Sequence, residues 1–106
     1  MIDPGRLNTR LTLQAPVESD DGQGGVVRSY APQAVVWARV VQHAAREGVD
    51  ADADRAMLRV AITLRGGVAL TRAHRLIDGA RIYRIVSWRK RDAGTWLEID
   101  AETRLG

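Results

Sequence analysis

Hydrophobic and polar residues alternate with a period of two along much of the chain. From residue 7 to residue 15, the odd positions are mostly apolar and the even positions are all polar. The same alternation returns over residues 58–65 and again over residues 96–103. A period of two places successive side chains on opposite faces of a β-strand. The pattern therefore predicts several strands, each with one face in a core.

A second kind of pattern covers residues 35–41, where apolar residues occupy both parities and Arg39 is the exception. A strand that is apolar on both faces is expected to be covered on both. We predict a core on one side and a partner subunit on the other, with a packed helix as the alternative cover. The candidate inter-subunit residues are Val36, Trp37, Arg39 and Val41.

Turn-forming residues separate the predicted strands. Pro16 is expected to end the first strand, and Pro32 to mark a bulge, an edge or a break. Residues 19–25 are expected to form a flexible hairpin loop, because glycine and aspartate favour turns. This loop is either a free tip or a docking loop that orders on assembly. Its candidate contact residues are Asp20, Asp21, Gly22, Gln23, Gly24 and Gly25.

Asp78-Gly79 lies between two apolar runs, which favours a tight two-residue hairpin. In the strand that follows, even spacing predicts that Ile82, Val86 and Trp88 share a face.

Residues 43–57 form an insertion that breaks the alternation. Small residues recur there at helical spacing, and Asp50 is suited to cap a short helix from Ala51 to Met57. The predicted fold is mainly β: a small antiparallel β-barrel of five to six strands, with one short α-helix between the second and third strands. Residues 1–106 make a single domain that begins with an N-terminal arm, residues 1–5.

Composition narrows the possible functions. The chain has 106 residues, a net charge of +3 and no cysteine, which excludes disulfides and thiolate chemistry. No apolar run approaches the roughly 18 residues that a membrane span needs. The start of the chain lacks the features of a signal peptide. We therefore expect synthesis in the cytoplasm and no membrane partner.

The sequence offers little for catalysis or metal binding. His43 and His74 belong to no recognisable motif, and no serine has a nucleophile context. Aspartates at 50, 52 and 54 resemble the start of a calcium loop. However, Arg55 and Ala61 stand where that loop needs glycine and glutamate. We predict no catalytic residue, no metal and no cofactor.

Arginines give one alternative function. Arg10, Arg59, Arg65, Arg81 and Arg89 fall where they could share outward faces of the sheet. A small β-barrel with such a face could bind single-stranded nucleic acid through phosphate contacts and aromatic stacking. Aromatic residues are only 5% of the chain, and the tryptophans fall at positions with core parity. A solvated or protein-binding face is therefore favoured.

The order of these features resembles a known family. The features are the strand at 6–14, Asp-Gly-Gln-Gly-Gly at 21–25, Val-Trp-Ala-Arg-Val at 36–40, Arg46-Glu47, the strand at 59–65 and the hairpin at 77–85. Together they are similar to the head–tail joining proteins of tailed phages, of the head-completion or stopper type. That family also occurs in prophages and gene transfer agents.

The resemblance implies a structural protein rather than an enzyme. It implies a closed ring of six or twelve copies at the neck of a phage-like particle. Portal–adaptor proteins would lie on the head side and tail-terminator or tail proteins on the other. Double-stranded DNA would pass through the lumen without sequence-specific contact. A tail-terminator ring is the neighbouring alternative. In a ring of this kind, the insertion at 43–57 is expected to face the lumen. Its candidate lumen residues are Arg46, Glu47, Asp50, Asp52, Asp54 and Arg55.

Overall fold

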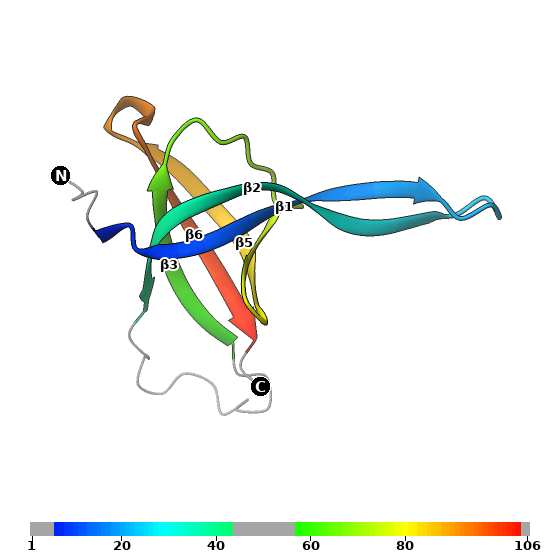
Figure 1. Cartoon of the computed structure of the whole chain (residues 1–106), viewed down its shortest axis with the longest axis horizontal. Coiled ribbons are helices and arrows are strands. Elements are labelled where there is room, and N and C mark those ends of the chain that lie inside the picture. Colours follow the sequence, from blue (N-terminus) through cyan, green and yellow to red (C-terminus); the bar gives the residue numbers. More distant parts are fainter. Residues whose placement is uncertain (1–5, 44–56, 105–106) are drawn as a thin grey trace.

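Six antiparallel strands make up the fold. The computed structural model describes residues 6–43 and 57–104. In chain order the elements are β1 (Thr9–Asp20), β2 (Val26–Gln42), β3 (Met57–Arg65), β4 (Arg75–Asp78), β5 (Arg81–Arg91), the 3₁₀ turn η3 (Asp92–Gly94) and β6 (Trp96–Arg104). The strands close into a barrel in the order β1-β2-β3-β6-β5-β4 (Figure 1). The predicted mainly-β, antiparallel architecture is confirmed.

The barrel interior is filled by the apolar residues of the alternating pattern. Leu11 and Leu13 from β1, and Leu97 and Ile99 from β6, are buried as their parity predicted. The remaining core residues are Ala38, Val60, Ile62, Leu64, Leu76, Tyr83, Ile85 and Ala101. Because the sheet closes on itself, strands inside the barrel are hydrogen-bonded to a neighbour on both edges. The barrel therefore needs no other chain to complete its backbone hydrogen bonds.

The predicted short helix falls almost wholly on residues 44–56, which lie outside the described residues, as does the N-terminal arm. Met57, its expected last residue, is instead the first residue of β3, opposite Arg104 of β6. Residues 6–43 and 57–104 contain no α-helix; the helical conformation there is 3₁₀, at Arg6 and in the turn η3.

The first strand does not end at Pro16, contrary to prediction. β1 pairs with β4 only from Thr12 to Gln14. Beyond that point its second edge has no strand partner among the described residues. A proline is tolerated on such an edge, because no ladder hydrogen bond is lost there. β1 and β2 therefore continue past the barrel as a two-stranded projecting hairpin, residues 15–31 (Figure 1).

A β-bulge marks the place where the projecting hairpin leaves the barrel. Leu13 pairs with Ala34 but Gln14 pairs with Pro32, so Gln33 is the extra residue. Of the bulge, edge or break expected at Pro32, the structure has a bulge, at the neighbouring Gln33. Bulges bend a strand and increase its twist, which fits the change of direction at this point.

The residues of β5 that face the core are Tyr83 and Ile85, and not the even-numbered set that was predicted to share a face. The tight two-residue turn is confirmed, but its residues are Gly79 and Ala80, with Gly79 at φ +59°. This register sets Tyr83 opposite the buried Leu76 and turns Tyr83 inward. Ile82 is 42% exposed instead. A bulge between Ile85 and Ser87 then interrupts the alternation on which the prediction relied.

Candidate assembly surface

The tip of the projecting hairpin is organised by two aspartates. The Asp21 carboxylate accepts hydrogen bonds from the backbone N–H of Gln23 (2.7 Å) and of Gly25 (2.9 Å). Asp20 accepts one from Gly22 N–H at 2.9 Å. These bonds favour the ionised carboxylate, so the hydrogen bonds from Gln23 and Gly25 hold the pKa of Asp21 below its usual range. The turn between the two strands thus spans residues 21–25, within the loop predicted at 19–25, and it carries negative charge.

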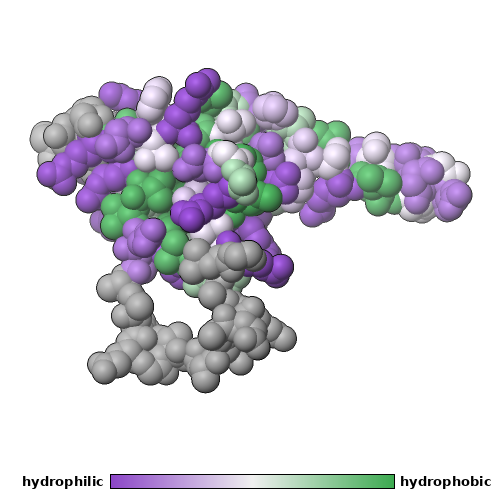
Figure 2. Space-filling model, turned by 60° about the horizontal axis from the view of Figure 1, so that its bottom comes forward, coloured by the Kyte–Doolittle hydropathy of each residue, from purple (hydrophilic) through white to green (hydrophobic). Residues whose placement is uncertain are grey.

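The projecting hairpin carries apolar side chains that its own barrel does not cover. Val17 is 43% exposed, Val26 65% and Val27 52%. Figure 2 shows green, apolar surface on this projection between purple, polar stretches. A two-stranded hairpin is at best marginally stable in water by itself. Its apolar side chains and open edges are features of a segment that gains stability from a partner.

Three polar contacts fix the projecting hairpin to the barrel. His74 Nδ1 accepts the Thr71 backbone N–H at 3.1 Å, so its Nε2–H donates to Oε1 of the bulge residue Gln33 at 3.0 Å. Arg75 Nε donates to Gln14 Oε1 at 2.7 Å, and its guanidinium stacks 3.8 Å from the centre of the Tyr30 ring. The loop before β4 and β4 itself thus hold the base of the hairpin.

The outer face of β2 is a second uncovered apolar surface. Trp37 is 57% exposed, Val35 51% and Val41 40%. Arg39 shares their parity and is half-buried. Val36 points the other way and packs against the core. In the described part of the chain, no helix covers this face. The strand predicted to need two covers therefore has its core on one side and an open face on the other.

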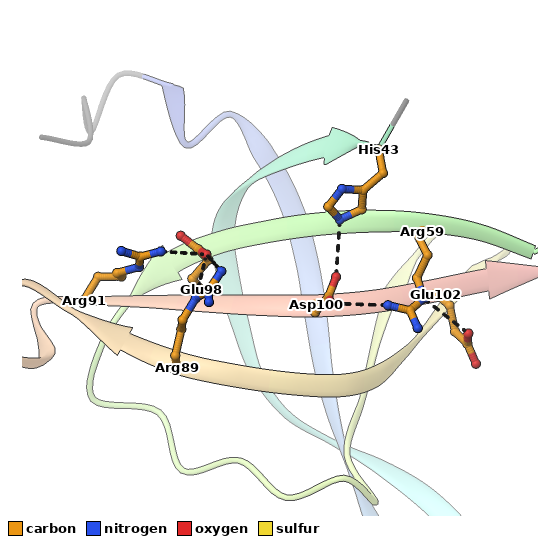
Figure 3. A network of polar contacts seen from close by, with 7 residues as sticks. All are labelled: His43, Arg59, Arg89, Arg91, Glu98, Asp100 and Glu102. Carbon is orange, nitrogen blue, oxygen red and sulfur yellow. Dashed lines mark hydrogen bonds and ion pairs between the residues drawn. The ribbon is translucent and has the colours of Figure 1, made fainter. Parts of the chain in front are cut away.

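A network of charged side chains runs along the outer face of β6 (Figure 3). Glu98 Oε1 accepts three hydrogen bonds, from Arg89 Nη2 (2.7 Å), Arg89 Nε (2.9 Å) and Arg91 Nη2 (3.4 Å). Hydrogen bonding from Arg89 is the largest of the effects that lower the pKa of Glu98. Each of these groups is a cross-strand neighbour, so the network ties β5 to β6.

The other half of the network joins the end of β2 to β3 and β6. Asp100 lies 3.3 Å from His43 Nε2 and accepts a hydrogen bond from Arg59 Nη1 at 3.2 Å. Arg59 Nε is 3.7 Å from Glu102. Trp88, Glu98 and Asp100 contribute to a shallow pocket of about 310 Å³ above this network. The charged groups of this network are paired with one another. We therefore interpret the network as one that stabilises the sheet rather than as a ligand site.

The described residues give no sign of a reactive centre. Among them, no group of three or more histidines or acidic residues is placed to hold a metal ion. His43 contacts Asp100, and His74 contacts Gln33 and the backbone and hydroxyl of Thr71. Within the same residues, no helix has the length and apolar character needed to cross a membrane.

The arginine face suggested for nucleic acid is largely occupied. Arg59 and Arg89 are paired with carboxylates, and Arg65 lies 5.6 Å from the centre of the Trp96 ring. The tryptophan argument against that function was nonetheless wrong. Trp96 is buried, but Trp37 is 57% exposed and Trp88 37% exposed. Parity failed here because an outward strand face can be apolar when a partner covers it.

The candidate residues of the sequence analysis separate into three groups. Asp20 to Gly25 form the hairpin tip, and Trp37, Arg39 and Val41 share the outer face of β2. Arg46, Glu47, Asp50, Asp52, Asp54 and Arg55 lie outside the described residues. Sequence reasoning missed Val35 and the hairpin valines at 17, 26 and 27. Val35 could have been predicted, because the odd positions from 35 to 41 lie on the same face of the strand as Trp37 and Val41.

A protein-family model matches nearly the whole chain. The family model described as phage head completion protein matches residues 2–104. A solved chain from the virion of a native gene transfer agent particle is 29% identical. It covers 92% of this chain and 94% of that one, with a TM-score of 0.74. No curated protein matches the chain.

A second solved structure extends the likeness of the fold. Protein SF1141 from Shigella flexneri 2a is 23% identical and has a TM-score of 0.73, covering 96% of each chain. At this identity the likeness is evidence for the fold alone.

Proposed function

The chain belongs to the phage head completion protein family, with a structural role between head and tail, and we propose that it acts there as a stopper-type connector. In this proposal several copies form a closed ring below the portal–adaptor complex of a phage-like particle. The ring extends the DNA channel and presents a docking surface to the tail. The match to a gene transfer agent virion chain supports a place in such a particle.

One observation carries the ring: the open outer face of β2. A closed barrel has already buried its core, yet Trp37, Val35 and Val41 form an apolar stripe in solvent. Contiguous exposed apolar surface of this kind is typical of protein interfaces. In a closed ring, the outer face of β2 in every copy could be covered by a different surface of the neighbouring copy.

The remaining partners follow from the family role. Portal–adaptor proteins would lie on the head side and tail-terminator or tail proteins on the other. Packaged double-stranded DNA would pass through the lumen without sequence-specific contact. The insertion at 43–57, with Arg46, Glu47, Asp50, Asp52, Asp54 and Arg55, is proposed to face that lumen. Six or twelve copies would close the ring.

Substitution of Trp37 tests this proposal. Trp37→Asp should weaken subunit contact by at least about 2 kcal/mol, or about 30-fold, because exposed tryptophans dominate interface energetics. The matched control is Trp88→Asp, which makes the same change at the other exposed tryptophan. Thermal unfolding of both purified proteins checks that the barrel still folds.

The measurement is the amount of this chain in purified particles and the fraction of particles with tails. We expect both to fall for Trp37→Asp and to stay near wild type for Trp88→Asp. Normal incorporation and tailing of Trp37→Asp particles would refute the β2 interface. Recovery of the chain with headless tail tubes would instead favour a tail-terminator ring.

A further inference from the structure

A basic hollow lies in the angle between the projecting hairpin and the barrel. It has a volume of about 480 Å³ and receives side chains from five elements and the loop before β4. Its arginines are Arg28, Arg72, Arg75, Arg84 and Arg104, and one carboxylate, Glu102, stands against them. The positive charges of these arginines repel one another, and a bound anion would reduce that repulsion.

The charges of the hollow are only partly balanced by the chain itself. Arg28 is paired with Glu18 at 2.8 Å, and Arg75 is held by Gln14 and Tyr30. The described residues place no carboxylate within 4.0 Å of Arg72, Arg84 or Arg104. As far as the described residues go, three guanidinium groups are therefore available to a ligand.

The walls of the hollow favour a protein segment over a DNA backbone. Tyr30, Met57 and Ile82 line it beside the arginines, and Ile82 and Met57 are exposed. Double-stranded DNA presents an outward row of phosphates, which suits an open basic surface. A concave site with both arginine and apolar walls suits a narrow segment that carries carboxylates next to apolar side chains.

The projecting hairpin of the same chain is such a segment. Its tip carries Asp20 and Asp21, and the apolar Val17, Val26 and Val27 follow directly behind. The ladder is continuous from the Ala15–Ala31 pair to the Asp20–Val26 pair, so the hairpin stays extended. It projects away from its own barrel (Figure 1).

We propose that the hairpin tip of one copy docks in the basic hollow of the next copy. Asp20 and Asp21 meet Arg72, Arg84 and Arg104, while the hairpin valines contact Tyr30, Met57 and Ile82. The two surfaces are different, so the contact is heterologous and repeats from copy to copy until a ring closes. This inference rests on the proposed ring and specifies its contact.

Charge reversal tests the contact in a way that misfolding cannot imitate. The tip variant is Ser19→Lys/Asp20→Lys, which leaves Asp21 and its turn in place. The hollow variant is Arg84→Glu/Arg104→Glu. Each variant alone sets like charges together and should lose self-association by about tenfold or more. An equal mixture restores opposite charges at every contact, so association should return to within about threefold of wild type.

The matched control is Arg65→Glu/Lys90→Glu. It makes the same change in net charge as the hollow variant, at the ends of β3 and β5 away from Met57 and Arg104. Sedimentation velocity over a concentration series measures association. We expect the control to associate like wild type.

Cysteine cross-linking locates the contact in assembled particles. The chain has no cysteine, so Ser19→Cys on the hairpin with Ala73→Cys at the hollow makes a clean pair. Oxidation should link neighbouring copies into a ladder of oligomers. Ser19→Cys with Thr95→Cys, in the loop between β5 and β6, should give no ladder.

Three results would overturn the inference. If particles contain the chain but oxidation gives no Ser19–Ala73 ladder, the contact is wrong while the connector role stands. If the hollow variant reduces DNA retention and the tip variant does not, the hollow binds phosphate instead. If wild-type chain is absent from particles, both the connector role and this contact fail.

Discussion

Glu98 shows how single side chains hold this barrel together. One of its carboxylate oxygens receives both Arg89 and Arg91, and hydrogen bonding from Arg89 lowers its pKa. A group whose pKa is lower in the folded state stabilises the fold above its unfolded pKa, about 4.3. That stability is lost as the pH falls through the folded value.

Replacing Glu98 tests this pH dependence. Glu98→Gln should lower the free energy of unfolding at pH 7 by about 1 kcal/mol, since a cross-strand charged pair is lost. The difference from wild type should be smaller at about pH 3 than at pH 7, because stability that comes from a lowered pKa is lost as the pH falls below the unfolded value of about 4.3. Urea unfolding at the two pH values measures it.

The control is Glu18→Gln, which removes an exposed pair with Arg28. Its effect should stay within about 0.5 kcal/mol at pH 7, because surface ion pairs contribute little. A Glu98→Gln protein as stable as wild type at pH 7 would contradict the account. So would a loss of the same size at both pH values.

Among the elements, the projecting hairpin is the one that the barrel does not need. From residue 17 to residue 29, every residue except Gly25 is exposed. The hairpin therefore adds no buried apolar surface to the core. Its role is argued from what it exposes: an acidic tip, three valines and open strand edges.

Shortening the hairpin separates folding from assembly. Residues 17–29 are replaced by Asn-Gly, which favours a tight two-residue turn. The free energy of unfolding should change by less than about 1 kcal/mol, because no core residue is removed. Incorporation of the chain into particles should be lost. Circular dichroism, thermal unfolding and particle immunoblots measure these outcomes.

Two results would count against this view of the hairpin. A shortened chain that no longer folds would show that the hairpin stabilises the barrel. A shortened chain that enters particles normally would show that the hairpin makes no essential contact there.

The sequence predicted the hairpin tip but not the length of the hairpin. Glycine and aspartate mark a turn through local backbone preferences, which act without tertiary context. Whether a strand continues past Pro16 depends on the reach of β4, a neighbour far along the chain. The bulges at Gln33 and Val86 likewise depend on the pairing of strands far apart in the sequence. In β5 the bulge changes which residues share a face, so alternation alone could not predict that face.

For the whole molecule, period-two alternation was enough to predict a mainly-β barrel. β1, β3 and β6 showed the pattern and bury most of the residues that it indicated. Outward residues were harder to predict, because a side chain on the outer face of a strand can face either solvent or a partner protein, and local sequence does not distinguish the two. Trp37 illustrates this: its position had indicated the core, yet it lies on the outer face of β2 and is 57% exposed. The basic hollow joins residues from 28 to 104 and has no local signal at all.

The central claim is that this chain forms a connector ring at the neck of a phage-like particle. Cryo-electron microscopy of particles made with and without the chain tests it most directly. We predict a ring of density below the portal that disappears in its absence, leaving heads that leak DNA or lack tails. The symmetry of the ring would give the copy number. A neck that is unchanged without the chain would contradict the claim.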